Sequence, residues 1–567
     1  MPALLSQWTS QFRSASISIT KSTRYALAIM IFGSLFYSCK KNSSNSGGTT
    51  PPPPVKSNQH NSLATQHGDN HRTGWNSTES ELNTTNVNTG KFGLILSLPV
   101  DDQVYSQPLV VGNLQVSGQT HNVLFIATVN NSVYAFDGDD GKLLWNNNFT
   151  VSGMRVVQNT DMTGACGGSY ADFSGHIGIV GTPVIDTVNK FIYFVARSTS
   201  QDGQTYLQQL HKVNIITGQD DIPPVTITAS YPGTGDGSQN LVINFNPQKQ
   251  NQRAALTLSN GNVIITWSSH CDWGPYHGWV IGYDAAGLNR QFVFNATPND
   301  ENGGIWESGQ GLSVDDQGNL YIATGNGSIF YGGGDGTDYG ESAVKLVVNG
   351  NSISVGSFFT PYNALFLNQN DLDFGSLGSL LIPHSNYFFT GAKDGSLFLL
   401  DKDNMGGYDS TANHVYQELN LGNPDANEHC QAAYFESANA GFVTLWSEND
   451  PLRVYPFVNN KLGNPVKSTI AGPVGQNGAM LSISSNGQNE GIIWATHAVA
   501  PGDAEHTVSN GILRAINAKN ITQELWNSNL SPSDQLGKYA KFATPTIVNG
   551  HVYVATFSNK VQVYGLK

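Results

Sequence analysis

The sequence predicts an all-β chain folded as an eight-bladed propeller, with the ring closed by a strand from near the N-terminus. Of the 567 residues, 61 are glycine and only 12% are charged, a composition typical of many short strands joined by tight turns. A unit of short strands recurs eight times, and one further strand has no partner of its own. Self-similarity of this kind, with four strands per repeat, is typical of a propeller.

The repeat is clearest between residues 106 and 145, which contain SQPLVV and then LFIATVNNSVYAFDGDDGKLLW. A short strand opens with a small residue and proline, an apolar strand ends in Ala/Thr or Gly, and a third strand ends in Tyr/Phe-x-x-Asp. Some copies add a Leu-Trp strand. Later copies begin near residues 181, 253, 309, 378, 432, 479 and 543.

The last copy supplies only three strands before the sequence ends. The apolar run FGLILSLPV, residues 92–100, precedes the first copy and has no partner there. Placing this strand on the outside of the last blade would close the ring and remove an exposed sheet edge. We therefore predict one propeller over residues 61–567.

The first forty residues are predicted to direct export. Arg13, Lys21 and Arg24 precede the apolar run 25–37, which is too short to span a bilayer and is typical of a secretory signal. Cys39 follows a small residue at the end of that run, an arrangement that resembles a bacterial lipoprotein signal with Cys39 as the lipidated residue. The alternative is an ordinary signal peptide with a chance cysteine.

The resulting expectation is a signal peptide over residues 1–38, a flexible Ser/Gly/Pro tether over residues 39–60, and a mature domain held at a bacterial membrane on its periplasmic or outer side. Three cysteines remain, Cys166, Cys271 and Cys430, which allow one bridge at most. The net charge is −14 and no basic cluster lies beyond the leader, which argues against nucleic acid as a partner. No C-x-x-C-H motif encodes a c-type haem.

Candidate site residues gather in the middle of the sequence, in GGIWESG (303–309), NLYIATGNGSIF (319–330), NDLDFGS (370–376) and GAKDGSLFLLDKDNMG (391–406). They supply an indole, an amide, two carboxylates and an ammonium: Trp306, Asn326, Asp371, Asp373 and Lys393. Such groups suit a flat anionic cofactor bound with a hard cation. Loops between blades and loops joining second to third strands emerge on one face of a propeller, so topology brings these segments to one mouth.

These runs resemble the eight-bladed quinoprotein alcohol dehydrogenases, which bind pyrroloquinoline quinone and Ca²⁺. The segment from 303 to 330 is similar to that family's GGTxWDS and GTGNGSPW motifs, and the resemblance implies that Trp306 forms the floor beneath the quinone and that Asn326 is a metal ligand. The segment from 391 is similar to the family's P-K-N-G-F-F-F-V-L-D-R-x-N-G motif. In that position Lys393 would bond the quinone oxygens.

The resemblance also implies a catalytic base and further metal ligands. Leu372-Asp373-Phe374 is similar to the family's Trp-Asp-Tyr, which makes Asp373 the base, although a shift to Asp371 is possible. In the branch that uses a lanthanide, a second Asp lies two residues after the base, so Asp371 and Asp373 could instead be base and ligand. In SSHCDWGPYHGW, Asp272 stands where the family has its metal-binding Glu.

Three departures from the family pattern matter. The family has two adjacent cysteines above the quinone, whereas Cys166 is followed by Gly167. We hypothesise instead a bridge between Cys166 and Cys271 beside the cofactor position. Asp272 is one methylene shorter than the Glu it replaces, and His277 stands where the family has an Arg.

Three functions follow from these observations. The first is a quinone- and metal-dependent dehydrogenase of small alcohols or sugars, which passes its electrons to a separate acceptor. The second is a non-catalytic lipoprotein propeller that serves as a scaffold or binds a partner. The third is a carbohydrate-binding or hydrolytic propeller, in which Trp273, Tyr276 and Trp279 would stack on sugars.

Overall fold

The structure is a computed structural model that describes residues 57, 59–329, 337–505 and 507–567. Cys39, the predicted signal peptide and most of the predicted tether lie outside these residues. In the part of the chain that is described, no helix is long and apolar enough to cross a bilayer.

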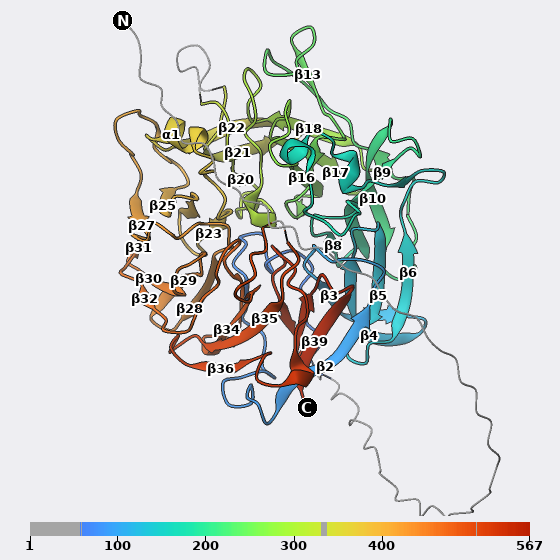
Figure 1. Ribbon diagram of the computed structural model, residues 1–567, viewed down its shortest axis with the longest axis vertical. Helices are drawn as coiled ribbons and strands as arrows, with labels where there is room; N and C mark the ends of the chain where they lie inside the picture. The colour runs from blue at the N-terminus through green and yellow to red at the C-terminus, as the bar shows by residue number, and fades with distance from the viewer. Residues whose placement is uncertain (1–56, 58, 330–336, 506) are drawn as a thin grey trace, which may run out of the picture. The chain divides into compact units, whose positions relative to one another are not determined.

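Eight sheets of four main strands form the predicted propeller (Figure 1). Each of the eight repeats identified in the sequence begins at the first strand of one sheet, so the predicted fold class and blade order are confirmed. Blades 1 to 4 comprise β3 (Leu109–Val116), β4 (Gln119–Ala127), β5 (Ser132–Asp137) and β6 (Leu143–Asn148); β8 (Val184–Asp186), β9 (Phe191–Thr199), β10 (Tyr206–Asn214) and β11 (Val225–Thr226); β15 (Thr257–Ser259), β16 (Asn262–Ser269), β17 (Trp279–Asp284) and β18 (Arg290–Asn295); and β19 (Ser313–Val314), β20 (Leu320–Ala323), β21 (Ala343–Asn349) and β22 (Ser352–Thr360).

Blades 5 to 8 comprise β23 (Leu380–Leu381), β24 (Tyr387–Gly391), β25 (Ser396–Asp401) and β27 (Gln417–Asn420); β28 (Ala433–Ser437), β29 (Ala440–Leu445), β30 (Arg453–Val458) and β31 (Lys461–Leu462) with β32 (Val466–Lys467); β33 (Met480–Asn486), β34 (Asn489–Ala498), β35 (Gly511–Asn517) and β36 (Glu524–Asn527); and β37 (Thr546–Val548), β38 (His551–Ala555), β39 (Lys560–Leu566) and β2 (Phe92–Pro99). Short strands extend some sheets: β1 (Trp75–Asn76), β7 (Arg155–Val156), β14 (Gln250–Asn251) and β26 (Gly407–Tyr408). A hairpin of β12 (Ser230–Pro232) and β13 (Val242–Asn244) stands apart.

The ring closes as the sequence predicted. β2 pairs antiparallel with β39 from Phe92 opposite Leu566 to Pro99 opposite Lys560, and the two strands lie side by side in blue and red in Figure 1. The hydrophobic core lies between neighbouring blades; for example, Val110 and Leu124 of blade 1 pack in one cluster with Val548 and Val561 of blade 8. Each blade therefore buries its faces only against its neighbours, as in other repeat architectures.

An unpredicted feature lies at the centre of the ring. Residues 61–76, here called the axial segment, hydrogen-bond the first strand of every blade. The bonded partners, in blade order, are Val110, Ile185, Thr257, Val314, Leu381, Tyr434, Ile483 and Ile547. Arg72 of this segment is 0% exposed, and its guanidinium donates to Gln66 O at 2.8 Å, Thr65 Oγ1 at 2.9 Å and Leu312 O at 3.1 Å. The axial segment thus ties all blades together along the propeller axis.

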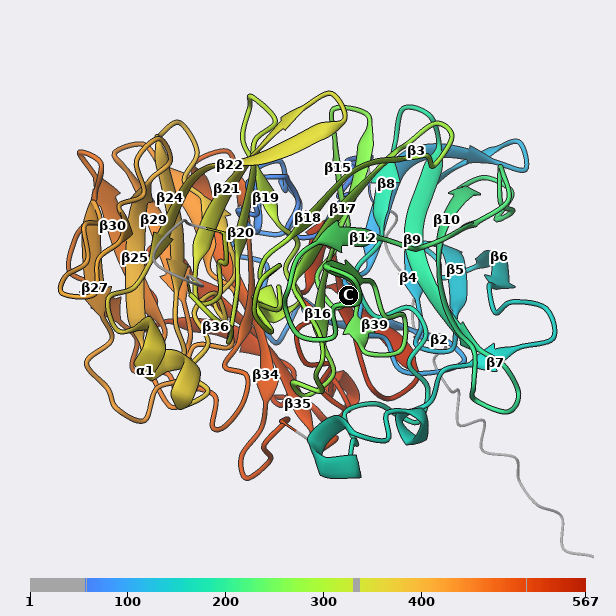
Figure 2. The same cartoon turned by 90° about the horizontal axis from the view of Figure 1, so that it is seen from above.

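The helical turns lie in connections between strands, outside the sheets. They are η1 (Asn159–Asp161), η2 (Ala165–Gly168), η3 (Glu307–Gly309), α1 (Ala364–Gln369) and η4 (Pro532–Asp534). Figure 2 shows α1 and the teal segment that follows β7 on the same side of the ring. That side carries the loops in which the candidate residues were found.

Candidate functional site

Most of the predicted site residues converge on one cavity. They come from separate loops: after β16, between β18 and β19, between α1 and β23, and after β24. The candidates that line the cavity are Cys271, Asp272, Trp306, Asp371, Asp373 and Lys393. Asn326 lies directly behind this wall, because its backbone N–H donates to Asp373 Oδ1 at 2.6 Å.

Asp373 and Lys393 form an ion pair in the wall of the cavity, beside Asp371. Lys393 Nζ lies 2.6 Å from Asp373 Oδ2 and 3.4 Å from Asp371 Oδ1. Burial acts to lower the pKa of Lys393, but Asp373 and Asp371 outweigh it and raise that pKa. Asp373 is 7% exposed and Asp371 is open to solvent, so the two carboxylates differ in environment. Both carboxylate oxygens of Asp373 are bonded, one to the Asn326 N–H and one to Lys393. These contacts hold the group in one position, as a general base requires.

Asp272 faces the same cavity and is open to it. Enclosure by the cavity walls and the charge of Asp373 raise the pKa of Asp272 to about 6, and Tyr276 donates its hydroxyl to Asp272 Oδ1 at 2.5 Å. Asn326 Nδ2 donates to Asp371 Oδ1 at 2.5 Å, whereas Asn326 Oδ1 is buried without a partner. Among the described residues, no three acidic, His or Cys side chains are already grouped as a metal site.

The residues present fit a flat anionic group and a hard cation by their chemistry. The Trp306 indole lines the cavity, and within the described ranges both its Nε1 and Asn326 Oδ1 are buried without a hydrogen-bond partner. A Cβ added at Gly325 would overlap Asp373 Oδ1 and lie 3.1 Å from Trp306 Cδ1, so this glycine keeps space open between indole and carboxylate. Carboxylate and amide oxygens are the ligands that Ca²⁺ takes in proteins.

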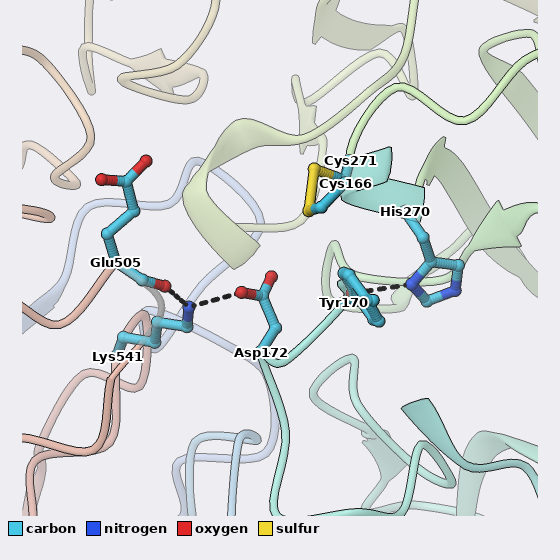
Figure 3. Close-up of a disulfide and its surroundings, with 7 residues drawn as sticks. All are labelled: Cys166, Tyr170, Asp172, His270, Cys271, Glu505 and Lys541. Carbon is cyan, nitrogen blue, oxygen red and sulfur yellow. Dashed lines mark hydrogen bonds and ion pairs between the residues drawn. A yellow bond between two sulfur atoms is a disulfide. The ribbon is translucent and has the colours of Figure 1, made fainter. Parts of the chain in front are cut away.

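The hypothesised disulfide is present. Cys166 and Cys271 are bonded, with their Cα atoms 5.4 Å apart and a separation of 105 positions in the sequence. It links η2 to the loop after β16 beside the cavity, as Figure 3 shows. Cys430 is a free, buried thiol.

Several non-glycine residues around the cavity have left-handed backbones. They are Cys166, Cys271, Asp272, Glu307, Ser308, Glu341 and Asp371, with φ between 44° and 55°. Each such conformation costs of order 1–3 kcal/mol and persists where the surroundings enforce it, commonly at functional sites. Other left-handed non-glycine residues lie in turns throughout the chain, so these conformations mark where loops around the cavity are constrained and do not by themselves identify a site.

Removing the disulfide is expected to destabilise the protein. A bridge that closes a loop of this length lowers the conformational entropy of the unfolded chain. In the chain-entropy model this stabilises the folded state by about 4–5 kcal/mol. The paired substitution Cys166→Ser with Cys271→Ser should therefore lower the thermal midpoint, measured by circular dichroism. A reducing agent should lower the midpoint of the wild type and leave that of the double variant unchanged; equal midpoints for the oxidised wild type and the variant would refute this expectation.

Glu307 is a buried carboxyl directly after Trp306. It is 0% exposed, accepts the Ala323 N–H at 2.9 Å, and has its pKa raised to about 8 by burial. The folded state therefore retains a proton that the unfolded state, with a pKa of 4.5, releases. The contribution of Glu307 to stability is therefore fully present below pH 4.5 and is lost as the pH rises toward 8, at up to about 1.4 kcal/mol per pH unit.

The substitution Glu307→Gln should flatten that decline, because the amide cannot ionise. Urea unfolding at pH 5, 6.5 and 8 measures it, with the exposed Glu418→Gln as the matched control. A decline in Glu307→Gln as steep as in the wild type would show that Glu307 is not the group responsible.

Other residues singled out in the sequence are not in the cavity. Tyr276 and Trp279 are each 1% exposed, so they cannot stack on a sugar as the carbohydrate hypothesis required. His277 is buried and bonded to Thr297 Oγ1 at 3.0 Å and to Asp236 O at 2.9 Å. Trp273 is partly exposed and packs near Lys249, which lies 5.1 Å from its ring.

The cavity also contains residues that were not predicted to belong to the site, although His429 was placed on the same face of the propeller. Arg253, Tyr170, His429 and Lys541 line it, and Glu341 lies behind it, with its pKa raised by burial and by Asp373. His429 Nδ1 is 2.8 Å from Glu448 Oε1. None of these belongs to a recognisable motif, and only their place in loops entering the same face could have drawn attention to them.

Comparison with known proteins agrees with this architecture. No protein-family model and no curated protein sequence matches the chain, whereas solved structures do. Quinohemoprotein alcohol dehydrogenase ADHIIG from Pseudomonas putida HK5 has a TM-score of 0.54 and 14% identity, over 89% of this chain and 80% of that chain. The quinohemoprotein alcohol dehydrogenase from Comamonas testosteroni has a TM-score of 0.55 and 13% identity, with the same coverage.

A europium-containing methanol dehydrogenase is similar as well, with a TM-score of 0.54 and 12% identity over 90% of this chain and 99% of that chain. Identities this low establish the fold and leave the chemistry to be argued from the residues. The chain has the eight-bladed propeller fold of the quinoprotein alcohol and methanol dehydrogenases.

Proposed function

We propose that the cavity binds pyrroloquinoline quinone together with Ca²⁺ or a lanthanide, and that the protein oxidises a small alcohol or sugar. One observation carries the proposal: Trp306, Asn326, Asp373 and Lys393, which come from four separate loops, meet at one cavity where two buried polar atoms have no partner among the described residues. The similar solved structures are named as quinohemoprotein and europium-containing dehydrogenases, which supports this choice of ligand.

The cation would be held by oxygen ligands, namely Asp272, Asn326 Oδ1 and Asp371. The quinone would lie on the Trp306 indole, with Lys393 beside its oxygens. When bound, the quinone accepts two electrons and the cation polarises its carbonyl as a Lewis acid. All other tasks fall to the side chains of this chain.

Asp373 would receive the proton of the substrate hydroxyl at Oδ2. Its Oδ1 is fixed by the Asn326 N–H, so the carboxylate cannot rotate freely, and among the described residues Oδ2 bonds only Lys393. The ammonium of Lys393 would balance the negative charge that develops as the substrate hydroxyl is deprotonated. Electrons would leave to a separate acceptor protein or molecule.

A second candidate function rests on the same ion pair. Lys393 lies 2.6 Å from Asp373 and neutralises the group that would act as base, which favours a propeller that binds a partner without catalysis. In either case we propose that the protein is exported and held at the membrane through a lipid on Cys39.

The test is titration of the purified full chain with pyrroloquinoline quinone plus Ca²⁺ or La³⁺, followed by quinone absorbance and thermal stability. We expect saturable binding that is lost in Trp306→Ala and retained in Trp273→Ala, which changes an indole outside the cavity. Binding would justify a screen of alcohols and sugars. No binding with either metal would refute the dehydrogenase and leave the partner-binding propeller.

A further inference from the structure

A second group of polar side chains lines the cavity, separate from Asp272, Asp371, Asp373 and Lys393. It contains Arg253, Tyr170, Asp172 and Lys541. Lys541 Nζ lies 3.5 Å from Asp172 Oδ1 and also bonds the Glu505 carbonyl, so its charge is largely balanced. Asp172 also acts on Arg253 through its charge, but among the described residues no carboxylate lies within ion-pair distance of the Arg253 guanidinium.

The Arg253 guanidinium is held in place by aromatic rings. Its Cζ lies 4.2 Å from the centroid of the Phe542 ring and 5.5 Å from that of Tyr105, and its Nη2 is buried with no hydrogen-bond partner among the described residues. Leaving a charged donor buried and unpaired costs more than the loss of an ordinary hydrogen bond. A guanidinium fixed in a cavity wall with an unused N–H is suited to bind a carboxylate.

The direction of the Tyr170 hydroxyl proton follows from its neighbours. Arg197 Nη1 lies 2.7 Å from His270 Nε2, and His270 Nδ1 lies 2.8 Å from Tyr170 Oη. A guanidinium can only donate, so Nε2 must be the accepting nitrogen and Nδ1 must carry the proton. Burial and the charge of Arg197 lower the pKa of His270 well below its usual value, which keeps it neutral.

His270 therefore donates to Tyr170, and the Tyr170 proton is left to point elsewhere. Tyr170 is one of the residues that line the cavity, so a ligand that reaches its hydroxyl from the cavity would accept this proton. The disulfide holds this arrangement, because Cys166 lies four residues before Tyr170 and Cys271 directly follows His270. Figure 3 shows the Tyr170–His270 bond beside the bridge.

We propose that Arg253 and Tyr170 form an anion subsite that binds a carboxylate of the ligand in this cavity, with His270 as the positioning residue for the Tyr170 hydroxyl. The identity of the ligand rests on the proposed function, since pyrroloquinoline quinone is a tricarboxylate. The subsite itself rests on the unused donors and would bind any ligand that places a carboxylate between them.

The experiment uses two probes on the full chain. Pyrroloquinoline quinone is titrated by absorbance, and benzene-1,3,5-tricarboxylate, which has the carboxylates without the quinone, is titrated by calorimetry. We expect Arg253→Gln to weaken both by about tenfold to a hundredfold and Tyr170→Phe by about tenfold. The trimethyl ester of the quinone should bind the wild type and Arg253→Gln alike.

His270 is tested through a double-mutant cycle. His270→Leu should weaken tricarboxylate binding as much as Tyr170→Phe does, and should cause no further loss in the Tyr170→Phe background, because it acts through that hydroxyl. Losses that add would overturn its positioning role. Two variants are the matched controls. Tyr283→Phe removes a buried hydroxyl that, unlike that of Tyr170, has no partner among the described residues, and Arg290→Gln changes an exposed guanidinium.

The outcomes separate this inference from the proposed function. Unchanged affinity of Arg253→Gln and Tyr170→Phe for both probes, with wild-type thermal unfolding, would overturn the subsite even if the quinone binds. Binding of the tricarboxylate with loss in Arg253→Gln would support the subsite even if the quinone fails to bind, and would then point to a different carboxylate ligand.

Discussion

Replacing Arg72 with leucine is expected to lower the free energy of unfolding by about 3 kcal/mol or more, because several buried acceptors would lose their donor at once. The guanidinium bonds the carbonyls of Gln66 and Leu312 and the hydroxyl of Thr257. These partners belong to the axial segment, to the approach to blade 4 and to blade 3. The loss should therefore affect the whole ring and not one loop.

Urea unfolding followed by tryptophan fluorescence measures this effect. Arg72→Lys, which keeps the charge and loses the planar fork, should fall between the wild type and Arg72→Leu. Arg290→Leu removes an exposed guanidinium and should change the midpoint little. An Arg72→Leu variant that unfolds at the wild-type urea concentration would show that the axial segment does not hold the blades.

The second large effect is expected at Asp373. If the cavity oxidises alcohols, Asp373→Asn should lower kcat by about a thousandfold, since a positioned general base typically contributes 10²–10⁴. The amide is nearly isosteric with the carboxylate, so quinone binding, followed by absorbance, should persist. Turnover would fall because an amide cannot accept the hydroxyl proton.

The control for this variant is Asp316→Asn, which changes a carboxylate that is 87% exposed and lies near His71, away from the cavity. Asp371→Asn distinguishes the two assignments of the base. A larger loss of kcat in Asp371→Asn than in Asp373→Asn would transfer the role to Asp371.

Much of the fold was predictable because a propeller repeats its local pattern. Each blade buries apolar strands against its neighbours, so the same alternation of strands and turns recurs, and residues 92–100 were recognisable as the strand missing from the last copy. The axial segment was not predictable in this way. Most of its residues are polar, and apolar and polar residues do not alternate along it. Its structure comes from hydrogen bonds to strands far away in sequence; for example, the Ile483 N–H donates to Gly74 O at 2.7 Å.

The site was predictable only in part, for a similar reason. Trp306, Asn326, Asp373 and Lys393 stand in motifs that resemble a known family, and the bridge between Cys166 and Cys271 followed from the absence of the family's cysteine pair. Arg253 and Tyr170 stand in no motif. Their significance comes from partners they have or lack in space, which a sequence does not display.

The axial segment also bears on how the cavity would be used. Gln66 Nε2 lies 2.9 Å from Gln431 Oε1, and Gln431 Nε2 lies 2.6 Å from the carbonyl of Ser308 in the cavity wall, so the axis is filled directly beneath the site. Substrate and product would then pass through the face of the ring that carries the cavity, and an acceptor that enters the cavity would compete with them for it. We therefore expect the oxidation of substrate and the release of electrons to alternate, and initial-rate plots at several acceptor concentrations to give the parallel lines of a ping-pong reaction.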